Sequence, residues 1–245
     1  MKKWCVLGGD ARACYLGDWI KANGSLLVDE PPCDVLVLPF PRSDVPESMT
    51  KQLPMGQCIV CGFVPAALES IAKEHGWRLI LPLNDETFNQ RNALPSAEGA
   101  IWAAMSHFDS TIALSRCVVS GYGRIGKELA RMLRALNAHV TVAARREESR
   151  REAGENSVSF ENVREALKNA DILFNTVPAR IFNEDVLKAL PKDALIFDLS
   201  SAPYGVDMEA AERLELRAWR EGSLPARYAP NEAAKILYEF VEVSL

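Results

Sequence analysis

The chain has 245 residues, of which 48% are hydrophobic and 25% are charged, and its formal net charge is −5. This length fits one large domain or two modest ones. The acidic balance argues against nucleic-acid binding, because no basic excess is available to neutralise phosphates. No apolar run approaches the roughly 18 residues of a membrane span, and the start MKKWCVLGGDAR turns polar too soon for a signal peptide. We expect a cytoplasmic protein that binds neither nucleic acid nor membrane.

In the first third of the chain, short apolar runs alternate with helical patterns, which is typical of parallel βαβ units. The candidate strands are KWCVLG, SLLV, DVLVLPF, CIVCGF and RLILPL. PAALESIAKEHG is typical of an intervening helix, with Pro65 at its start and Gly76 at its end. These patterns predict a flavodoxin-like, doubly wound substrate domain over residues 1–93. The amphipathic C-terminal helix, residues 230–245, is expected to pack back on it.

The six cysteines do not form a metal motif. Only Cys58 and Cys61 have ligand-like spacing, and no second CxxC or histidine pair completes a zinc set. They lie in QCIVCGF, a predicted buried strand, where residues three apart face opposite sides. We therefore expect buried thiols in a reducing compartment and no metal site.

Residues 94–229 are predicted to form a second domain that opens with a long connecting helix. LPSAEGAIWAAMSHFDSTIALS is rich in small and apolar residues, and Ser96 is placed to cap its start. Six candidate strands follow from residue 117, in the arrangement of the Rossmann dinucleotide-binding fold. They are CVVSG, HVTVAA, SVSF, DILFNTV, ALIFDLS and LRAW. The predicted fold class is α/β, with two doubly wound parallel-sheet domains joined by the connecting helix.

A glycine-rich turn follows the first strand of the second domain. Its residues are Gly121, Tyr122, Gly123, Arg124, Ile125 and Gly126. The first glycine permits a tight turn, the second lets the backbone approach a pyrophosphate, and the third lets the helix pack on the strand. An ordinary structural turn is the alternative. The apolar strand before the turn and the amphipathic helix after it favour dinucleotide binding.

The end of the next strand indicates which nicotinamide cofactor would bind. An acidic residue there would bind the ribose 2′-hydroxyl, but this chain has Ala144, Arg145 and Arg146. Guanidinium groups can grip a 2′-phosphate through paired hydrogen bonds. The alternative is that both arginines are solvated residues at a helix start. We predict NADP, with Arg124 as a further charged contact beside the pyrophosphate.

Other candidate residues follow the strands, because ligands of open α/β sheets bind beyond their carboxyl ends. After the first strand, Arg12 could hold a substrate carboxylate, with Asp10 orienting it or handling a proton; a helix cap with a surface ion pair is the alternative. His107, in the connecting helix, is the one histidine near the predicted cleft. Along the predicted cofactor path lie Asn175, Thr176, Val177, Pro178, Leu199 and Ser200, although a serine after a strand is also a common cap.

The order of these segments resembles the A subunit of the dipicolinate synthase family. The resemblance rests on GGDAR, NALPSAEGAIWAAM, GYGRIG with VAAR, NTVPARIFNEDVL, IFDLSSAPYGVD and LPARYAPNEAAKIL. In the closing loop, Ala226, Glu232 and Ala234 stand where that family has glycine, threonine and glycine.

The resemblance implies an NADP-dependent oxidoreductase that converts a dihydrodipicolinate-type precursor of the lysine pathway to dipicolinate, pyridine-2,6-dicarboxylate. It implies that the partner is the flavoprotein-like second subunit of dipicolinate synthase, in the mother cell of a sporulating bacterium, and we expect a homo-oligomer. A dicarboxylate substrate gives a role to Arg12 and Arg227. The candidate catalytic residues are Asp10, Arg12, Glu98 and Ser200. Two alternatives stay open: another two-domain nicotinamide-dependent dehydrogenase of an amino or hydroxy acid, and a non-catalytic NADP-binding subunit.

Overall fold

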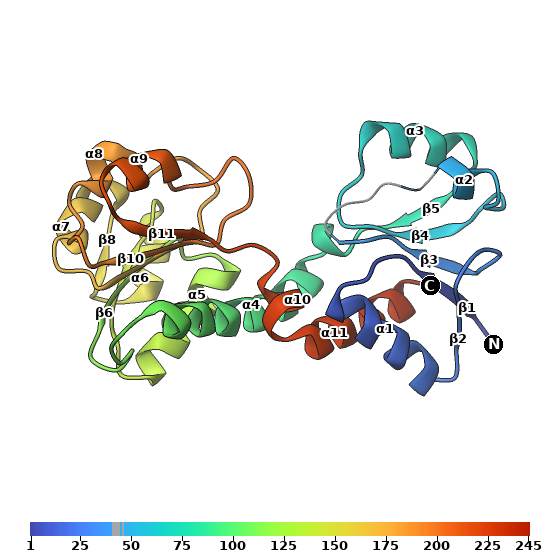
Figure 1. Cartoon of the computed structure of the whole chain (residues 1–245), viewed down its shortest axis with the longest axis horizontal. Helices are drawn as coiled ribbons and strands as arrows, with labels where there is room; N and C mark the ends of the chain where they lie inside the picture. The colour runs from blue at the N-terminus through green and yellow to red at the C-terminus, as the bar shows by residue number, and fades with distance from the viewer. Residues whose placement is uncertain (41–44, 46) are drawn as a thin grey trace. The chain divides into compact units, whose positions relative to one another are not determined.

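The computed structural model describes residues 1–40, 45 and 47–245 and divides into two α/β units (Figure 1). The first unit comprises Met1–Asn92 and Pro225–Leu245, and the second comprises Ala93–Leu224. Each unit contains a parallel sheet with helices on its faces. The predicted fold class is confirmed.

The sheet of the first unit has the strand order β2-β1-β3-β4-β5, and every neighbouring pair is parallel. The strands are β1 (Lys3–Val6), β2 (Leu26–Val28), β3 (Val35–Val37), β4 (Cys58–Val60) and β5 (Arg78–Ile80). The helices between them are α1 (Ala11–Ala22), α2 (Glu47–Thr50) and α3 (Ala66–Glu74), and η1 (Pro82–Asn84) is a 3₁₀ turn. This order is the flavodoxin-like arrangement, whose ligands bind between the first and third strands.

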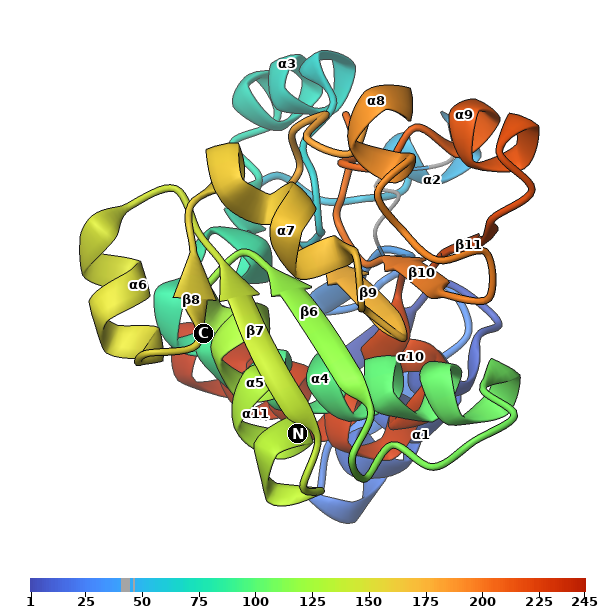
Figure 2. The same ribbon diagram turned by 90° about the vertical axis from the view of Figure 1, so that its left-hand side faces the viewer.

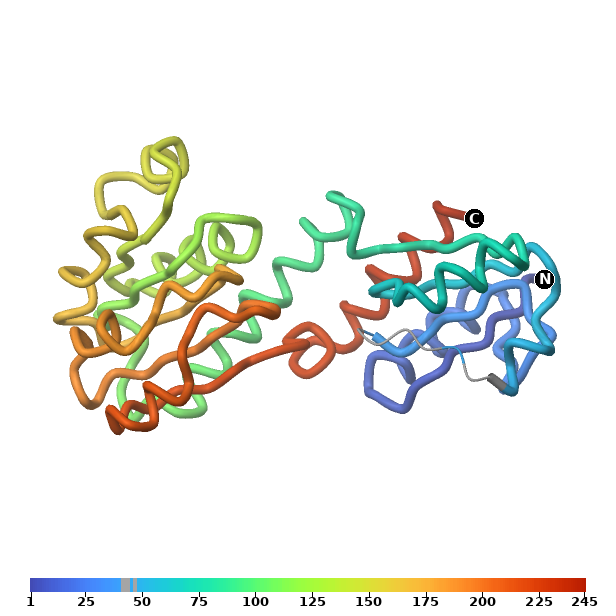
Figure 3. Tube along the Cα trace, turned by 90° about the horizontal axis from the view of Figure 1, so that it is seen from above, coloured from blue at the N-terminus to red at the C-terminus, as the bar shows by residue number. Residues whose placement is uncertain are grey.

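The C-terminal helix α11 (Pro230–Ser244) completes the core of the first unit, beside α1 (Figure 3). Its buried residues Ala233, Leu237 and Val241 recur at helical spacing, which gives one apolar face. Trp4 of β1 lies against the ring of Tyr238, with the ring centroids 5.8 Å apart. The helix therefore covers one face of the sheet with apolar surface that would otherwise be exposed.

The sheet of the second unit has the strand order β11-β10-β9-β6-β7-β8, and its paired strands are parallel (Figure 2). The strands are β6 (Arg116–Ser120), β7 (His139–Ala143), β8 (Ser157–Val158), β9 (Ile172–Asn175), β10 (Leu195–Asp198) and β11 (Arg217–Arg220). Counted within the unit, this is the order 3-2-1-4-5-6 of the Rossmann fold. The strand order reverses between β6 and β9, because the chain first builds the sheet to one side of β6 and then to the other, so a ligand is expected beyond these two strand ends.

Short helices connect the strands of the second unit. They are α5 (Arg124–Ala135), α6 (Glu147–Ala153), α7 (Val163–Leu167), α8 (Glu184–Leu187) and α9 (Met208–Arg213), with the 3₁₀ turn η2 (Phe160–Asn162) before α7. Every residue of β9 and β10 is buried, as expected for central strands with helices on both faces.

The helix that enters the second unit, α4 (Glu86–His107), starts ten residues before Ser96. The prediction that Ser96 caps this helix is wrong, because Ser96 is buried inside it. Asp85 lies just before its first residue and accepts a hydrogen bond from the Phe88 amide at 2.8 Å, as an N-terminal cap does. Leu-Pro-Ser is typical of a helix start, since proline lacks the amide that an interior position uses. Here Pro95 lies within the helix.

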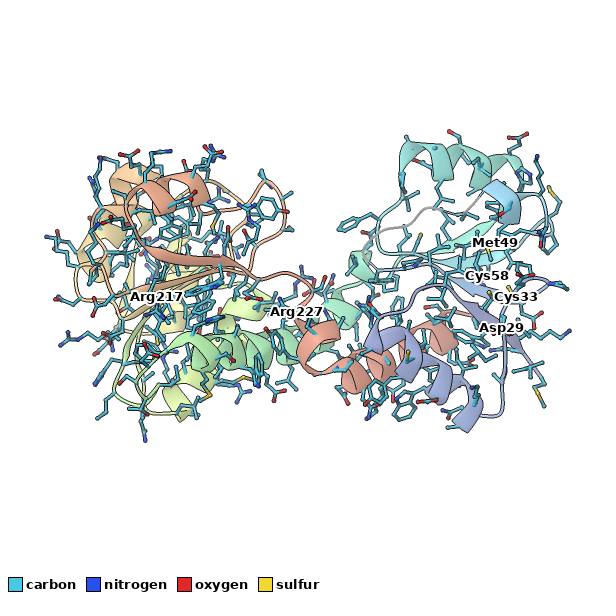
Figure 4. The ribbon with its side chains drawn as sticks, viewed as in Figure 1. Asp29, Cys33, Met49, Cys58, Arg217 and Arg227 are labelled. Atoms are coloured by element: carbon cyan, nitrogen blue, oxygen red, sulfur yellow. The ribbon has the colours of Figure 1, made fainter. Side chains whose placement is uncertain are left out.

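His107, at the end of α4, packs against the edge of the second sheet. Its ring stacks on Trp219 of β11, with centroids 4.2 Å apart, and Arg217 donates a 2.7 Å hydrogen bond to its carbonyl oxygen. Figure 4 labels Arg217 on this strand. These contacts give His107 a structural role at the helix terminus.

Cys58 and Cys61 are buried, as predicted, and Figure 4 labels Cys58 and Cys33 in the first unit. Cys14 is exposed. Within the described ranges, no three His, Cys, Asp or Glu side chains are grouped so that they could hold a metal ion. Over the same residues, no helix combines the length and apolar character needed to cross a membrane.

Candidate functional site

The turn between β6 and α5 has two glycines that the protein itself requires. Gly121 has φ +94°, and a Cβ atom there would collide with Thr176 Oγ1. A Cβ atom on Gly126 would collide with the carbonyl oxygen of Gly121. At Gly123, in contrast, a Cβ atom would meet nothing within 4 Å. A bare backbone that faces open space at this position fits a pyrophosphate lying against it.

The first turn of α5 is also open to an anion. Gly123 is its N-cap residue and has no side chain that could accept a hydrogen bond from the first amides of the helix. The amides of a first helical turn and the helix dipole together favour a negatively charged group. The opposite face of α5 holds it on the sheet through buried Leu129 and Leu133.

A cavity of about 620 Å³ opens over this turn. Its size is within the usual range for small-molecule sites. The lining residues are 121–125, 144–146, 149, 160, 176–179 and 181. The structure therefore brings together the predicted residues of the glycine turn, of the β7 end and of the β9 end. Gly126 lies beneath the turn, as its close contact with Gly121 requires.

Arg145 and Arg146 lie at the rim of this cavity, and both are exposed. No hydrogen bond or ion pair of either guanidinium group is made with another described residue. Arg124, on the first turn of α5, lines the same cavity and is also exposed. The cavity is thus bordered by three cations, and an acidic residue is missing from the end of β7.

A buried hydrogen-bond network joins the ends of β9 and β10. Asp198 is fully buried, and its Oδ1 accepts hydrogen bonds from Asn175 Nδ2 at 2.8 Å and from Ser200 Oγ at 2.7 Å. Its Oδ2 accepts from the backbone amides of Gly205 and Val206 at 3.1 and 3.0 Å. A buried carboxylate needs such donors, because burial without partners is costly. A Cβ atom on Gly205 would collide with Asn175 Nδ2, so this glycine is required by the network.

The network places Asn175 and Ser200 behind the cavity wall and not on its lining. Asn175 Oδ1 accepts from the Val177 amide at 3.1 Å, and Thr176 Oγ1 donates to the Ser120 carbonyl at 2.8 Å. The loop that lines the cavity is held in this way against the glycine turn. Leu199 is half-buried and also lies outside the cavity lining.

Sequence reasoning missed Asp198 and Gly205 as site residues. The signal in the sequence was the single acid that ends the otherwise apolar strand LIFD. A carboxylate next to residues that are all expected to be buried needs several hydrogen-bond donors close by.

The first unit has a smaller cavity of about 110 Å³ at the ends of β1 and β3, and Arg12 lines it. The Arg12 side chain is only 15% exposed, and its Nη2 donates one long hydrogen bond, 3.4 Å, to the Phe40 carbonyl. The guanidinium also lies 3.6 Å from Asp10 Oδ2 and 4.8 Å from the centre of the Phe40 ring. Burial lowers the pKa of Arg12 from its ordinary value, and Asp10 opposes this shift.

Asp10 combines two of the predicted roles. Its Oδ1 accepts from the Ala13 amide at 2.8 Å and caps α1, while its Oδ2 faces Arg12. The structure therefore brings these two residues together. A guanidinium group has five N–H donors, and most of those on Arg12 lack a close acceptor among the described residues.

Comparison with known proteins identifies the family to which the chain belongs. Residues 79–214 match the model of the D-isomer specific 2-hydroxyacid dehydrogenase NAD-binding domain. The chain belongs to the D-isomer specific 2-hydroxyacid dehydrogenase family. Its second unit is therefore a nicotinamide dinucleotide-binding domain, which fits the glycine turn and the cavity.

Within this dehydrogenase family, the chain is similar to the A subunit of dipicolinate synthase from Bacillus subtilis, with 35% identity over 184 residues. That alignment covers 74% of this chain and 62% of the relative's length. The crystal structure of the dipicolinate synthase A subunit from Bacillus halodurans superimposes with a TM-score of 0.88 at 26% identity, over 99% of this chain and 97% of that one. The Bacillus subtilis structure gives 0.84 at 28% identity, over 99% and 95% of the two chains. The resemblance indicated by the sequence motifs is confirmed.

The remaining candidate residues of this dehydrogenase-family chain are distributed over both units. Glu98 is exposed on α4 and, like Ser200, belongs to the second unit. Asp10, Arg12 and Arg227 belong to the first unit. Arg227, labelled in Figure 4, is exposed on α10 (Leu224–Tyr228), and its Nη2 donates to Tyr228 Oη at 2.9 Å.

Proposed function

We propose that this chain is an NADP-dependent oxidoreductase that oxidises a dihydrodipicolinate-type dicarboxylate to dipicolinate and works with a flavoprotein-like second subunit. The observation that carries the cofactor assignment is the pair Arg145 and Arg146 at the rim of the dinucleotide cavity, without an acceptor on the described part of the protein. The similarity to the A subunit of dipicolinate synthase supports the substrate and the partner.

The cofactor would be held by two groups of residues. The amides of the glycine turn and the first turn of α5 would bind the pyrophosphate, and Arg124 would add a charge beside it. Arg145 and Arg146 would bind the 2′-phosphate of NADP, which NAD lacks. An acidic residue at this strand end would repel that phosphate, and this chain has none there.

The environment of Arg12 supports the proposal that the substrate carries a carboxylate. The Arg12 guanidinium is largely withdrawn from water but, among the described residues, makes only one long hydrogen bond and one loose ion pair. A planar carboxylate could replace these weak contacts with two short, charge-assisted hydrogen bonds. Asp10, which faces the same guanidinium, would keep it oriented when the substrate is absent.

Oxidation of a dihydropyridine ring to a pyridine removes one hydride and one proton. The bound nicotinamide supplies the hydride acceptor, and the proton leaves to a base or to water. The Ser200 hydroxyl donates to Asp198 and accepts from the Gly205 amide at 3.1 Å. These contacts support a positioning role for Ser200, in which it fixes the loop after β10.

Because the Ser200 hydroxyl is already used in hydrogen bonds to Asp198 and Gly205, a second candidate function is also favoured, that of a non-catalytic NADP-binding subunit. In this case the first unit would bind or sense a carboxylate for a catalytic partner. Both candidates need the same cofactor cavity, so they differ in product formation and not in cofactor affinity.

A direct assay separates the two candidates. The purified chain, alone and with a flavoprotein-like subunit of a dipicolinate synthase, would be given a dihydrodipicolinate precursor with NADP or with NAD. Dipicolinate would be measured by terbium luminescence. We expect product with NADP in the presence of the partner, and a much lower rate with NAD. Tight NADPH binding without any dipicolinate would favour the non-catalytic function and contradict the oxidoreductase.

A further inference from the structure

A further arginine, Arg150 of α6, is hydrogen-bonded to the turn that carries Arg145 and Arg146. Arg150 Nη1 donates to the Ala144 carbonyl at 2.9 Å and to the Arg145 carbonyl at 2.7 Å. Both carbonyls lie just beyond the last residue of β7, where the sheet ladder ends. The hydrogen bond to Ala144 is half-buried and the one to Arg145 is exposed, so a single guanidinium group ties together two successive carbonyls of the turn.

Other contacts hold the far end of α6. Lys127 of α5 forms an ion pair with Glu152 at 2.7 Å, and Arg134 donates to the Ala153 carbonyl at 2.9 Å. A helix of seven residues contributes little stability by itself, so its position depends on such contacts. Arg150 is the contact that fixes its N-terminal end to the strand end.

Arg150 differs from its neighbours in its position. It is half-buried and is not among the residues that line the cavity, whereas Arg145 and Arg146 are exposed and line it. The backbone at residues 144–145 determines where the side chains of the two lining arginines start. A turn held by two hydrogen bonds lowers the conformational entropy that is lost when these side chains bind a phosphate.

We propose that Arg150 is a positioning residue for cofactor selectivity, which holds the β7–α6 turn so that Arg145 and Arg146 face the 2′-phosphate of NADP. This inference rests on the NADP part of the proposed function. It assigns Arg150 no contact with the cofactor. Its removal should therefore lower the affinity for NADPH and spare the affinity for NADH.

The test compares R150A and R150K with R151A in the full chain. Arg151 is a matched control, because it is adjacent on α6, has the same charge, is 76% exposed and pairs with the Glu147 side chain instead of the carbonyls of residues 144 and 145. Dissociation constants of NADPH and NADH would be measured by nicotinamide fluorescence, and thermal unfolding would check that each variant folds. We expect R150A to weaken NADPH binding about tenfold and NADH binding less than twofold. R150K should recover part of this loss, and R151A should stay within twofold of the unmodified chain for both cofactors.

A mutant cycle tests whether Arg150 acts through the two lining arginines. In the R145A/R146A background, R150A should weaken NADPH binding less than twofold further. Equal losses for NADPH and NADH in R150A, or a tenfold loss that persists in the R145A/R146A background, would overturn the positioning role. An NADPH preference unchanged by R150A would overturn it as well and leave the proposed function intact. Equal affinities of the unmodified chain for NADPH and NADH would instead overturn the NADP assignment, and this inference with it.

Discussion

The two units place their cavities at the same topological position but surround their cations differently. In the first unit the cavity lies after β1 and β3, and in the second it lies after β6 and β9, which are the strands between which the strand order of each sheet reverses. Arg12 is largely buried in the first cavity. Arg145 and Arg146 are exposed at the rim of the second.

This difference in burial predicts that a substrate carboxylate at Arg12 and a 2′-phosphate at Arg145 and Arg146 gain different binding free energies from these arginines. A buried guanidinium with few acceptors has already lost part of its hydration, so a carboxylate that binds it adds strong hydrogen bonds in a low-dielectric site. Exposed guanidinium groups stay hydrated and are screened by salt, so each contributes less to binding. Loss of Arg12 should therefore cost more than loss of either arginine at the cofactor rim.

The largest effect is expected within the glycine turn. G126A places a methyl group against the Gly121 carbonyl and should destabilise the fold by about 3 kcal/mol, as overpacking does. G123A meets no protein atom, so it should fold normally but bind NADPH at least tenfold more weakly. Chemical denaturation and NADPH titration of both variants measure this contrast. A G123A variant with unchanged NADPH affinity would show that no phosphate lies against this backbone.

R12A is expected to have the next largest effect. It should lower kcat/KM for the dicarboxylate about 30-fold to 150-fold, from roughly 2–3 kcal/mol for a hydrogen bond to a charged group. NADPH affinity should be unchanged, because Arg12 belongs to the other unit. R12K is the matched control, since it keeps the charge but loses the paired donors. If R12A alters NADPH affinity and not substrate kinetics, the carboxylate assignment is wrong.

A smaller effect is expected at the cofactor rim. R145A should weaken NADPH binding about tenfold and leave NADH binding unchanged, and R145D should reverse part of the preference. Because this arginine is exposed, the NADPH preference should shrink as salt rises. Titrations at low and high ionic strength measure both effects. A preference that is insensitive to salt would contradict an exposed phosphate contact.

The smallest effect concerns the thiols in the two cores. Burial raises the pKa of Cys33 in the first unit to about 12 and that of Cys117 in the second to about 11, from an ordinary 9.0. Below pH 9 the thiols are protonated in both the folded and unfolded states. Above pH 9 only the unfolded chain readily loses these protons, so stability should fall as pH rises toward 11 and 12. A constant free energy of unfolding between pH 8 and 10.5 would contradict this sign.

Thiol labelling at pH 8 gives a companion measurement. Exposed Cys14 should react quickly, and Cys33 and Cys117 only after unfolding, because the reactive species is the thiolate. Rapid labelling of Cys33 or Cys117 in the native chain would show that the core around it opens easily.

Much of this architecture follows from local sequence patterns. Apolar runs of four to seven residues, most of them followed by a helical pattern, predict both parallel sheets, and the glycine turn predicts the dinucleotide cavity. The start of α4 could not be predicted from the local sequence, because Leu94-Pro95-Ser96 is typical of a helix start. In the structure, Pro95 lies inside a longer helix. Local propensity is weaker than the burial of a long apolar helix face.

The internal support of the site was harder to predict. Asn175 and Ser200 follow strands, as ligand-binding residues often do, but their side chains are used by Asp198. Contacts between residues 23 positions apart depend on strand pairing, and the sequence alone does not state which polar groups will share a buried carboxylate. The role of Arg150 could not be predicted either, because the sequence RREESRRE does not distinguish its four arginines. In the structure, Arg150 is the arginine of this segment that donates hydrogen bonds to the carbonyls of the turn.

The most direct test of the central claim is a side-by-side titration of the unmodified chain with NADPH and NADH at physiological salt. The glycine turn and cavity predict that both cofactors bind, and Arg145 and Arg146 predict that NADPH binds at least tenfold more tightly. Equal affinities, or tighter binding of NADH, would contradict the assignment of these two arginines to a 2′-phosphate.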